Sequence, residues 1–139
     1  MAPEIRGICP LLQVYDMPTS LRFYRDMLGF EIVSTSPLLG EDRCHWAWLR
    51  LGGAALMLNT AYEFEEERPV PADPARAVGH QDVCLYFGCP EIDTAYESLR
   101  GKVPGLRPPH VAPYGMKQMY FRDPDGFGLC YQWRAESAS

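Results

Sequence analysis

The residues best able to do chemistry are few, and the clearest group lies near the C-terminal end. The stretch "YFRDPDGFGLCYQW", residues 120 to 133, predicts a strand, a tight turn and a second strand that carries Cys130 at its middle. Asp123 and Asp125 look like a catalytic carboxylate pair. Turn chemistry accounts for them, because aspartate hydrogen-bonds to its own backbone in a type I turn, and the proline and glycine beside them suit such a turn. The question that remains is why a thiol lies at the centre of a regular hairpin.

Five cysteines and three histidines are further candidates for binding a metal or acting as a nucleophile. The cysteines are odd in number and include no C-x-x-C pair, which predicts reduced thiols in a cytoplasmic protein, each serving as a small buried residue. We interpret His45 as a partly exposed strand residue, His110 as a loop residue, and His80 as a loop residue near a potential site. No phosphate loop, nucleophile elbow or Ser/His/Asp spacing is present, so no catalytic residue is assigned.

Composition narrows the classes of protein further. The 139 residues are 47% hydrophobic and 22% charged, which is typical of one globular domain. A net charge of -5 argues against nucleic acid as a partner. No apolar run approaches the roughly 20 residues of a membrane helix, and the first residues lack the apolar core of a signal peptide. We therefore expect a cytoplasmic protein that has no membrane partner.

The order strand, helix, strand, hairpin occurs twice along the chain. In the first half, Asp16 suits a helix N-cap, apolar residues recur at helical spacing from Leu21 to Leu28, and Gly29 suits the helix end. Gly52 and Gly53 predict a hairpin turn between two strands. We expect strands at 8–15, 31–36, 45–51, 54–59, 82–87, 116–121 and 128–133, with the second helix running from Pro90 to Gly101.

This repetition predicts a single domain, 1–139, made of two βαβββ modules at 5–64 and 79–134. Residues 65–78, which begin "EEERPVPADPAR", contain three prolines in that stretch and alternating charges, and we interpret them as a linker. The predicted fold class is α+β, with the two modules pairing into a curled mixed sheet around a cleft. The linker is long enough for the halves to close on one another or to exchange between two chains.

The chain resembles the glyoxalase/bleomycin resistance/dioxygenase superfamily, whose fold is also called vicinal oxygen chelate. The resemblance lies in "LLQVYDMPTSLRFYRDMLGFEIV", "LRLGGAALML", "DVCLYFGCPEIDTAYESLR" and "MYFRDPDGFGLCYQW". It covers residues from about Ile8 to Trp133, and its most specific parts are the helix ending in Leu-Gly-Phe and the Asp-Pro-Asp-Gly hairpin. The resemblance implies a fold, which does not by itself fix a function.

The resemblance also implies a concave cleft, into which four metal ligands point in the metal-using members. Carried over position by position, these ligands fall on Cys9, Met57, Asp82 and Cys130, where such enzymes have imidazole or carboxylate groups. Two thiols and a thioether therefore stand at three of the four positions. Cys9, Asp82 and Cys130 leave a zinc site open as an alternative, since thiolates bind zinc well. No close cysteine pair supports that alternative, and we predict neither a metal nor another cofactor.

Strand alternation from these four positions predicts the wall of the cleft. A loop residue, Tyr114, joins them because the family's analogous loops cover the cleft. The predicted ligand-binding residues are Cys9, Leu11, Gln13, Met57, Asn59, Asp82, Cys84, Tyr86, Tyr114, Cys130 and Gln132. This wall is soft and almost uncharged, which favours an organic ligand over a divalent cation.

Three functional hypotheses follow. The leading one is a metal-free protein that binds a small, antibiotic-like organic molecule. The second is a metal-dependent lyase, isomerase or dioxygenase of the same superfamily with shifted ligands. The third is a dimeric interaction module whose cavity is filled by side chains such as Met57 and Tyr86. The resemblance further implies a homodimer, swapped or unswapped.

Overall fold

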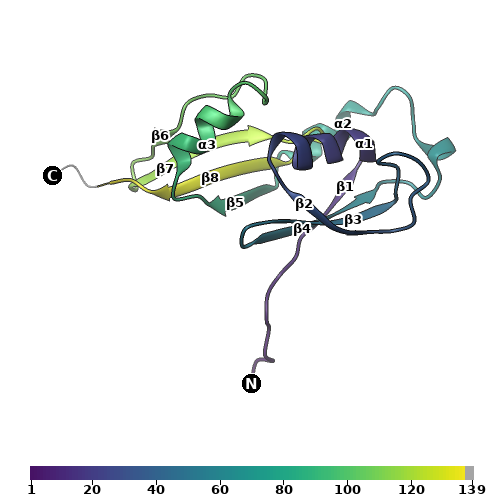
Figure 1. Ribbon diagram of the computed structural model, residues 1–139, viewed down its shortest axis with the longest axis horizontal. Helices are drawn as coiled ribbons and strands as arrows, with labels where there is room; N and C mark the ends of the chain where they lie inside the picture. Colours follow the sequence, from purple (N-terminus) through teal and green to yellow (C-terminus); the bar gives the residue numbers. More distant parts are fainter. Residues whose placement is uncertain (137–139) are drawn as a thin grey trace.

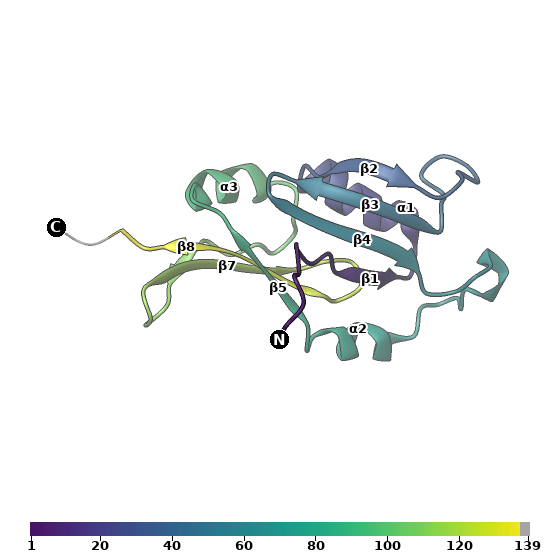
Figure 2. The same cartoon turned by 90° about the horizontal axis from the view of Figure 1, so that it is seen from below.

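Two four-stranded mixed sheets make up the protein (Figures 1 and 2). The computed structural model describes residues 1–136. The strand orders are β1-β4-β3-β2 and β5-β8-β7-β6. The neighbours β1 and β4 are parallel, and so are β5 and β8. This identical order in both sheets confirms the predicted α+β fold of two βαβββ modules. No helix in this part of the chain has the length and apolar character needed to cross a membrane.

The elements follow the predicted order with small shifts at their ends. They are β1 (Leu11–Val14), α1 (Met17–Leu21), η1 (Arg22–Met27), β2 (Glu31–Thr35), β3 (Trp46–Leu51), β4 (Ala54–Thr60), η2 (Glu65–Glu67), α2 (Pro74–His80), β5 (Cys84–Gly88), α3 (Ile92–Leu99), β6 (His110–Val111), β7 (Met116–Arg122) and β8 (Gly128–Arg134).

The first helix begins and ends where the sequence predicts. The Asp16 side chain accepts a hydrogen bond from the Thr19 amide (3.3 Å), which satisfies one of the free amides at the helix start. The helix then widens into the π-helical stretch η1, in which the Leu28 amide donates to the Phe23 carbonyl (3.0 Å). It stops at Gly29, whose φ of +90° lies in the left-handed region that glycine adopts readily.

The predicted linker contains regular structure, which the sequence interpretation missed. Helix α2 begins directly after Asp73, whose side chain accepts from the Ala75 amide (3.0 Å), with Pro74 in the first turn. An aspartate followed by proline is a helix-start signal, but the prolines before it were read as a continuous loop. The short strand β6 was also missed, because a two-residue edge strand leaves no periodic pattern in a sequence.

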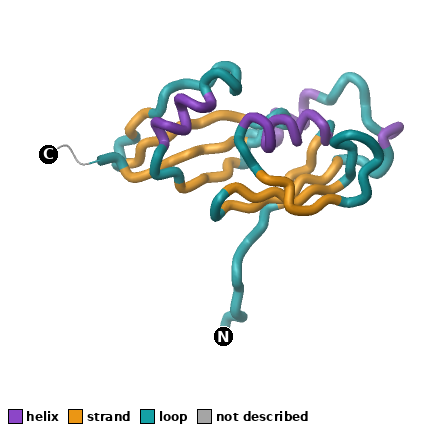
Figure 3. The backbone as a smooth tube through the Cα atoms, viewed as in Figure 1, coloured by secondary structure: helices purple, strands orange, loops and turns teal. Residues whose placement is uncertain are grey.

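Helices α1 and α3 lie on the same side of their sheets (Figures 1 and 3). Beneath α1, the first sheet buries alternate residues such as Leu12, Leu49 and Leu58. In the second sheet the alternate residues Met119, Leu129 and Tyr131 are buried in the same way. Among residues 1–136, no helix lies over the opposite face of either sheet (Figures 1 and 3), so each sheet has one open face.

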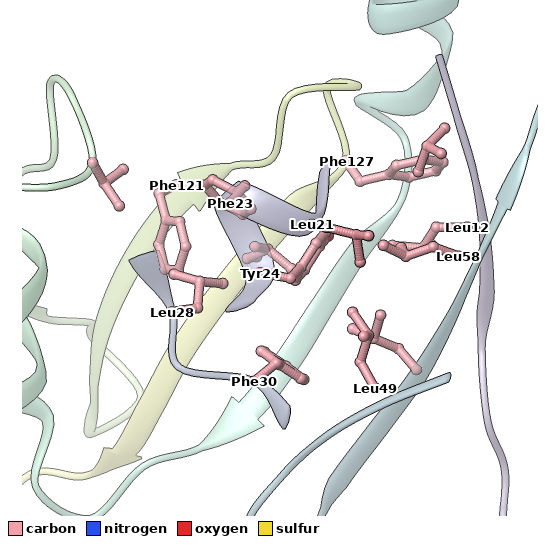
Figure 4. Close-up of a cluster of buried hydrophobic side chains, with 14 of the residues drawn as sticks. Leu12, Leu21, Phe23, Tyr24, Leu28, Phe30, Leu49, Leu58, Phe121 and Phe127 are labelled. Carbon is pink, nitrogen blue, oxygen red and sulfur yellow. The ribbon is translucent and has the colours of Figure 1, made fainter. Parts of the chain in front are cut away.

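The two modules share one hydrophobic core rather than two. Phe23 from the first helix lies 6.4 Å, centroid to centroid, from Phe121 of β7, and Phe30 lies 6.3 Å from Phe87 of β5. Figure 4 shows Phe23 beside Phe121, with Leu21 and Tyr24 close by. The core therefore crosses the boundary between the modules.

The hairpin carboxylates, Asp123 and Asp125, reinforce this boundary. Asp125 is buried and accepts from the Tyr15 amide (2.7 Å), Arg76 Nη1 (3.1 Å) and the Ser20 hydroxyl (3.3 Å). These three donors come from the first module and from α2.

Asp123 accepts from two backbone amides of its own turn, those of Asp125 and Phe127, both at 2.9 Å, and from the Tyr24 hydroxyl at 2.7 Å. Turn chemistry therefore explains only part of the role of these carboxylates. The rest is a connection between modules, and both groups are too enclosed to meet a substrate.

Candidate functional site

The open face of the first sheet carries half of the predicted cleft. Cross-strand neighbours point to the same side of a sheet, so the pairs Leu11 with Met57 and Gln13 with Asn59 form one patch on β1 and β4. Trp48 of β3 lies opposite Met57 and is 37% exposed, and Trp46 lies opposite Asn59. We call this group the first-sheet patch.

The open face of the second sheet explains the thiol at the centre of the last strand. Cys130 lies on β8 between Tyr86 of β5 and Tyr120 of β7, and it pairs with both. The two tyrosine hydroxyls meet at 3.0 Å, and Cys130 is completely buried. A small side chain on the middle strand lets the two phenols approach each other above it. Cys130 is thus a spacer beneath a tyrosine pair and not an exposed cleft residue.

A chain of hydrogen bonds lies beside this pair. The Tyr114 hydroxyl donates to Gln118 Oε1 (2.9 Å), and Gln118 Nε2 donates to Gln132 Oε1 (2.9 Å). Gln118 is only 2% exposed and holds both neighbours in place. Together with Cys84 and the tyrosine pair, these residues form the second-sheet patch.

Gln118 and Tyr120 were not predicted as site residues. The turn length contains the missing signal, because a hairpin closing at Arg122 and Gly128 places Tyr120 opposite Cys130 and Gln118 opposite Gln132. His110 stacks near Tyr120 with ring centroids 6.2 Å apart, and it too was interpreted only as a loop residue.

The four positions implied for metal ligands do not make a metal site. Cys9 precedes β1, Asp82 is exposed before β5, and Cys130 is buried. Within residues 1–136, no group of three or more His, Cys, Asp or Glu side chains is arranged to hold an ion. Burial raises the pKa of both the Cys84 and Cys130 thiols, which disfavours the thiolate that a metal needs. The donor set therefore does not fit the metal chemistry of the family's metal-using members.

Nine of the eleven predicted residues fall in two patches rather than in one closed pocket, and Cys9 and Asp82 belong to neither patch. A groove of about 720 Å³ runs between the modules, lined by Ile8, Pro10, 51–56 and 84–88. Of the predicted residues, Cys84 and Tyr86 line this groove. The two patches lie on different sheets, each with its own set of contacts.

Comparison with known families shows which family the chain belongs to. The model of the Glyoxalase/Bleomycin resistance protein/Dioxygenase superfamily matches residues 8–131. The chain belongs to this superfamily. The match extends through both βαβββ modules and confirms the resemblance seen in the sequence. The comparison with curated proteins gave no match.

Solved structures of the superfamily have the same fold. A glyoxalase/bleomycin resistance protein/dioxygenase from Nocardioides is 26% identical, with a TM-score of 0.71, and the match covers 99% of this chain and 89% of that one. The bleomycin-binding protein of Streptomyces verticillus, solved with copper(II)-bleomycin, is 19% identical, with a TM-score of 0.65 and coverage of 98% and 100%.

A lactoylglutathione lyase from Agrobacterium tumefaciens is 22% identical, with a TM-score of 0.64 and coverage of 93% and 94%. A bleomycin-binding protein and a lyase therefore resemble this chain to a similar degree. Similarity at about 20% identity shows the fold, and the function has to be inferred from the residues of the site.

Proposed function

We propose that this protein binds a small, uncharged or weakly charged organic molecule without a metal, in the manner of the superfamily's antibiotic-binding members. The observation that carries this proposal is the chemistry of the two patches. They present tryptophan, tyrosine and amide side chains around Met57 and Cys130, two of the positions where the resemblance implies metal ligands. Aromatic walls with a few fixed polar groups suit a flat organic ligand. The likeness to proteins that bind bleomycin and another antibiotic agrees with this function.

A second copy of the chain would complete the cleft. The two patches lie on open faces of different sheets, and a flat ligand needs a wall on both of its sides. The first-sheet patch also exposes apolar side chains, with Leu11 at 45% and Trp48 at 37%. A homodimer that sets the first-sheet patch of one chain against the second-sheet patch of the other would cover both.

Tryptophan fluorescence gives a direct test, because Trp46 and Trp48 belong to the first-sheet patch. The purified protein is titrated with a panel of antibiotics that includes metal-free bleomycin. We expect at least one compound to quench fluorescence saturably with a dissociation constant in the micromolar range or below. The Met57→Ala variant should weaken binding about tenfold, because a buried contact with the ligand is lost.

A thiol variant separates this function from that of a metal enzyme. Cys130→Ala keeps a small residue beneath the tyrosine pair, so ligand affinity should change by less than about threefold. The metal-dependent alternative requires stoichiometric metal in protein purified without chelator, and its loss in Cys130→Ala. That result, or the absence of binding across the panel, would contradict the proposal.

A further inference from the structure

A second cavity lies at the end of the first sheet, beyond Trp46 and Asn59 at the edge of the first-sheet patch. Its volume is about 330 Å³, at the small end of the range for small-molecule sites. None of the eleven predicted cleft residues lines it. The lining comes from the junction of β1 with α1, from the loop before β3, and from the segment after β4. From the sequence, His45 was interpreted only as a partly exposed strand residue, and the predicted cleft does not include it.

Aromatic rings form one side of the cavity. Tyr15 and Tyr62 meet edge to face with centroids 6.2 Å apart, and Phe64, which is 55% exposed, stands at the rim. The Arg68 guanidinium already lies over the face of the Tyr15 ring, 5.0 Å from its centroid, so what this side of the cavity offers a ligand is packing against an apolar ring.

Three carboxylates and one guanidinium also line the cavity, and most of them are engaged. Asp16 caps the first helix, and Glu65 pairs with Arg68 (2.7 Å) and with Arg43 (4.0 Å). Glu66 makes no ion pair or side-chain hydrogen bond with any described residue. It is therefore the carboxylate left to meet a ligand.

His45 supplies an acceptor that the fold leaves unused. The Thr60 hydroxyl donates its one hydrogen to the Tyr62 carbonyl (2.9 Å), so it must accept from His45 Nδ1 (3.2 Å). In the neutral imidazole this places the lone pair on Nε2. Within 1–136, Nε2 has no hydrogen-bond partner.

The Tyr62 hydroxyl is the third free group. It is buried and has no hydrogen-bond partner among the described residues, which is costly for a polar atom. Burial raises the pKa of Tyr62 to about 12, so the group remains a neutral hydroxyl. It can accept a hydrogen bond from a ligand or give one.

We propose that this cavity binds a small aromatic monoamine. The ammonium group would donate to Glu66 and to His45 Nε2, and the ring would pack against Tyr15 and Tyr62. Arg43 at the same cavity repels every positive charge, so a ligand with one ammonium group, held against Glu66, is favoured over a polyamine that would bring more charge near the guanidinium. This site is independent of the cleft and of whatever the cleft binds.

The test uses 2-phenylethylamine as the probe, with 2-phenylethanol as its neutral counterpart and phenyltrimethylammonium as a cation without N–H donors. Binding to the full-length protein is measured by calorimetry, and backbone amide NMR shifts locate it. We expect saturable binding of the amine, with the largest shifts at residues 43–45 and 60–66. The alcohol and the quaternary cation should each bind at least about fivefold more weakly, because each lacks one of the two interactions.

Matched variants test the individual groups. His45→Asn keeps a donor at the Nδ1 position for Thr60 but has no group at the Nε2 position, and it should weaken amine binding about fivefold. Glu66→Gln should weaken it similarly, whereas Glu67→Gln removes the same charge from the next residue, which does not line the cavity, and should have little effect. The cleft variant Met57→Ala should leave amine affinity unchanged.

Three results would overturn the proposal. They are no saturable amine binding, equal affinity for the amine and the alcohol, and equal effects of Glu66→Gln and Glu67→Gln. None of these results depends on whether the cleft binds an antibiotic, so the two proposals fail separately.

Discussion

Asp123 is the residue whose environment departs most from what its sequence position predicts. An aspartate in a four-residue turn normally faces water, but this one is 6% exposed. Burial raises its pKa to about 6, against the lowering effect of hydrogen bonds from the Tyr24 hydroxyl and two backbone amides. The charged form of Asp123 therefore costs folding free energy as the pH rises.

The sign of this effect can be measured by comparing the wild type with Asp123→Asn. A raised carboxyl pKa contributes stability below the unfolded pKa of 3.8, and that contribution is lost as the pH rises through about 6. From pH 3 to pH 7 the wild type should lose about 3 kcal/mol of unfolding free energy relative to the variant. Urea unfolding at a series of pH values gives this difference. If the difference stays constant or reverses sign with pH, the hydrogen bonds to Asp123 offset the whole cost of burying its charged form, and the prediction is wrong.

Tyr24→Phe probes the same pair from the other side. The Tyr24 hydroxyl is buried and donates to Asp123, so its removal disfavours the charged carboxylate further. We expect the variant to lose about 1–3 kcal/mol of unfolding free energy at pH 7, and less at pH 4. A loss that is equal at both pH values would indicate a packing effect without electrostatic coupling.

At the scale of elements, helix α2 packs closely against the hairpin turn, although the sequence predicted a linker there. Gly126 has a φ of +89°, and a Cβ atom placed on it would lie 2.5 Å from the carbonyl oxygen of Ala77. His80 stacks on Phe127 with ring centroids 4.0 Å apart, and its Nδ1 lies 2.7 Å from the Asp125 carbonyl oxygen. The turn glycine is thus required by both conformation and contact.

Gly126→Ala should therefore destabilise the protein by about 3 kcal/mol or more, since strain and overlap with α2 add. Gly29→Ala is the matched control, because Gly29 has nearly the same φ, +90°, but no atom within 4 Å of the added group. The control should cost about 1 kcal/mol. Thermal unfolding of both variants separates the two terms, and equal losses would mean that α2 moves aside freely.

The elements also show where sequence reasoning succeeds and where it stops. Periodicity predicted the two main helices and the long strands, because their buried faces follow the repeat of each structure. It missed α2, whose seven residues include none that is buried. It placed Cys130 on the correct face of the sheet. It did not predict that Tyr86 and Tyr120 cover this residue, because the spacing of residues along a strand does not show which side chains cover which.

At the scale of the whole molecule, both open sheet faces look away from the helices, as Figure 1 shows. If a second copy covers the first-sheet patch, size-exclusion chromatography with light scattering should give twice the chain mass. Trp48→Lys should weaken this association at least tenfold, because it places a charge in an apolar contact. Leu38→Lys, at a residue 64% exposed in the loop before β3, is the control and should leave the mass unchanged. If the wild type is monomeric, the proposal that a second chain completes the cleft is wrong.

The core shared by the two repeats has a consequence for how the protein loses its structure. Phe87, Phe121 and Tyr131 of one repeat are covered by aromatic residues that include some from the other, so neither half retains a dry interior alone. Heat or denaturant should therefore melt both repeats in one cooperative step, with coincident circular dichroism and fluorescence curves. The chain repeats one motif twice, but we expect neither repeat to be stable without the other.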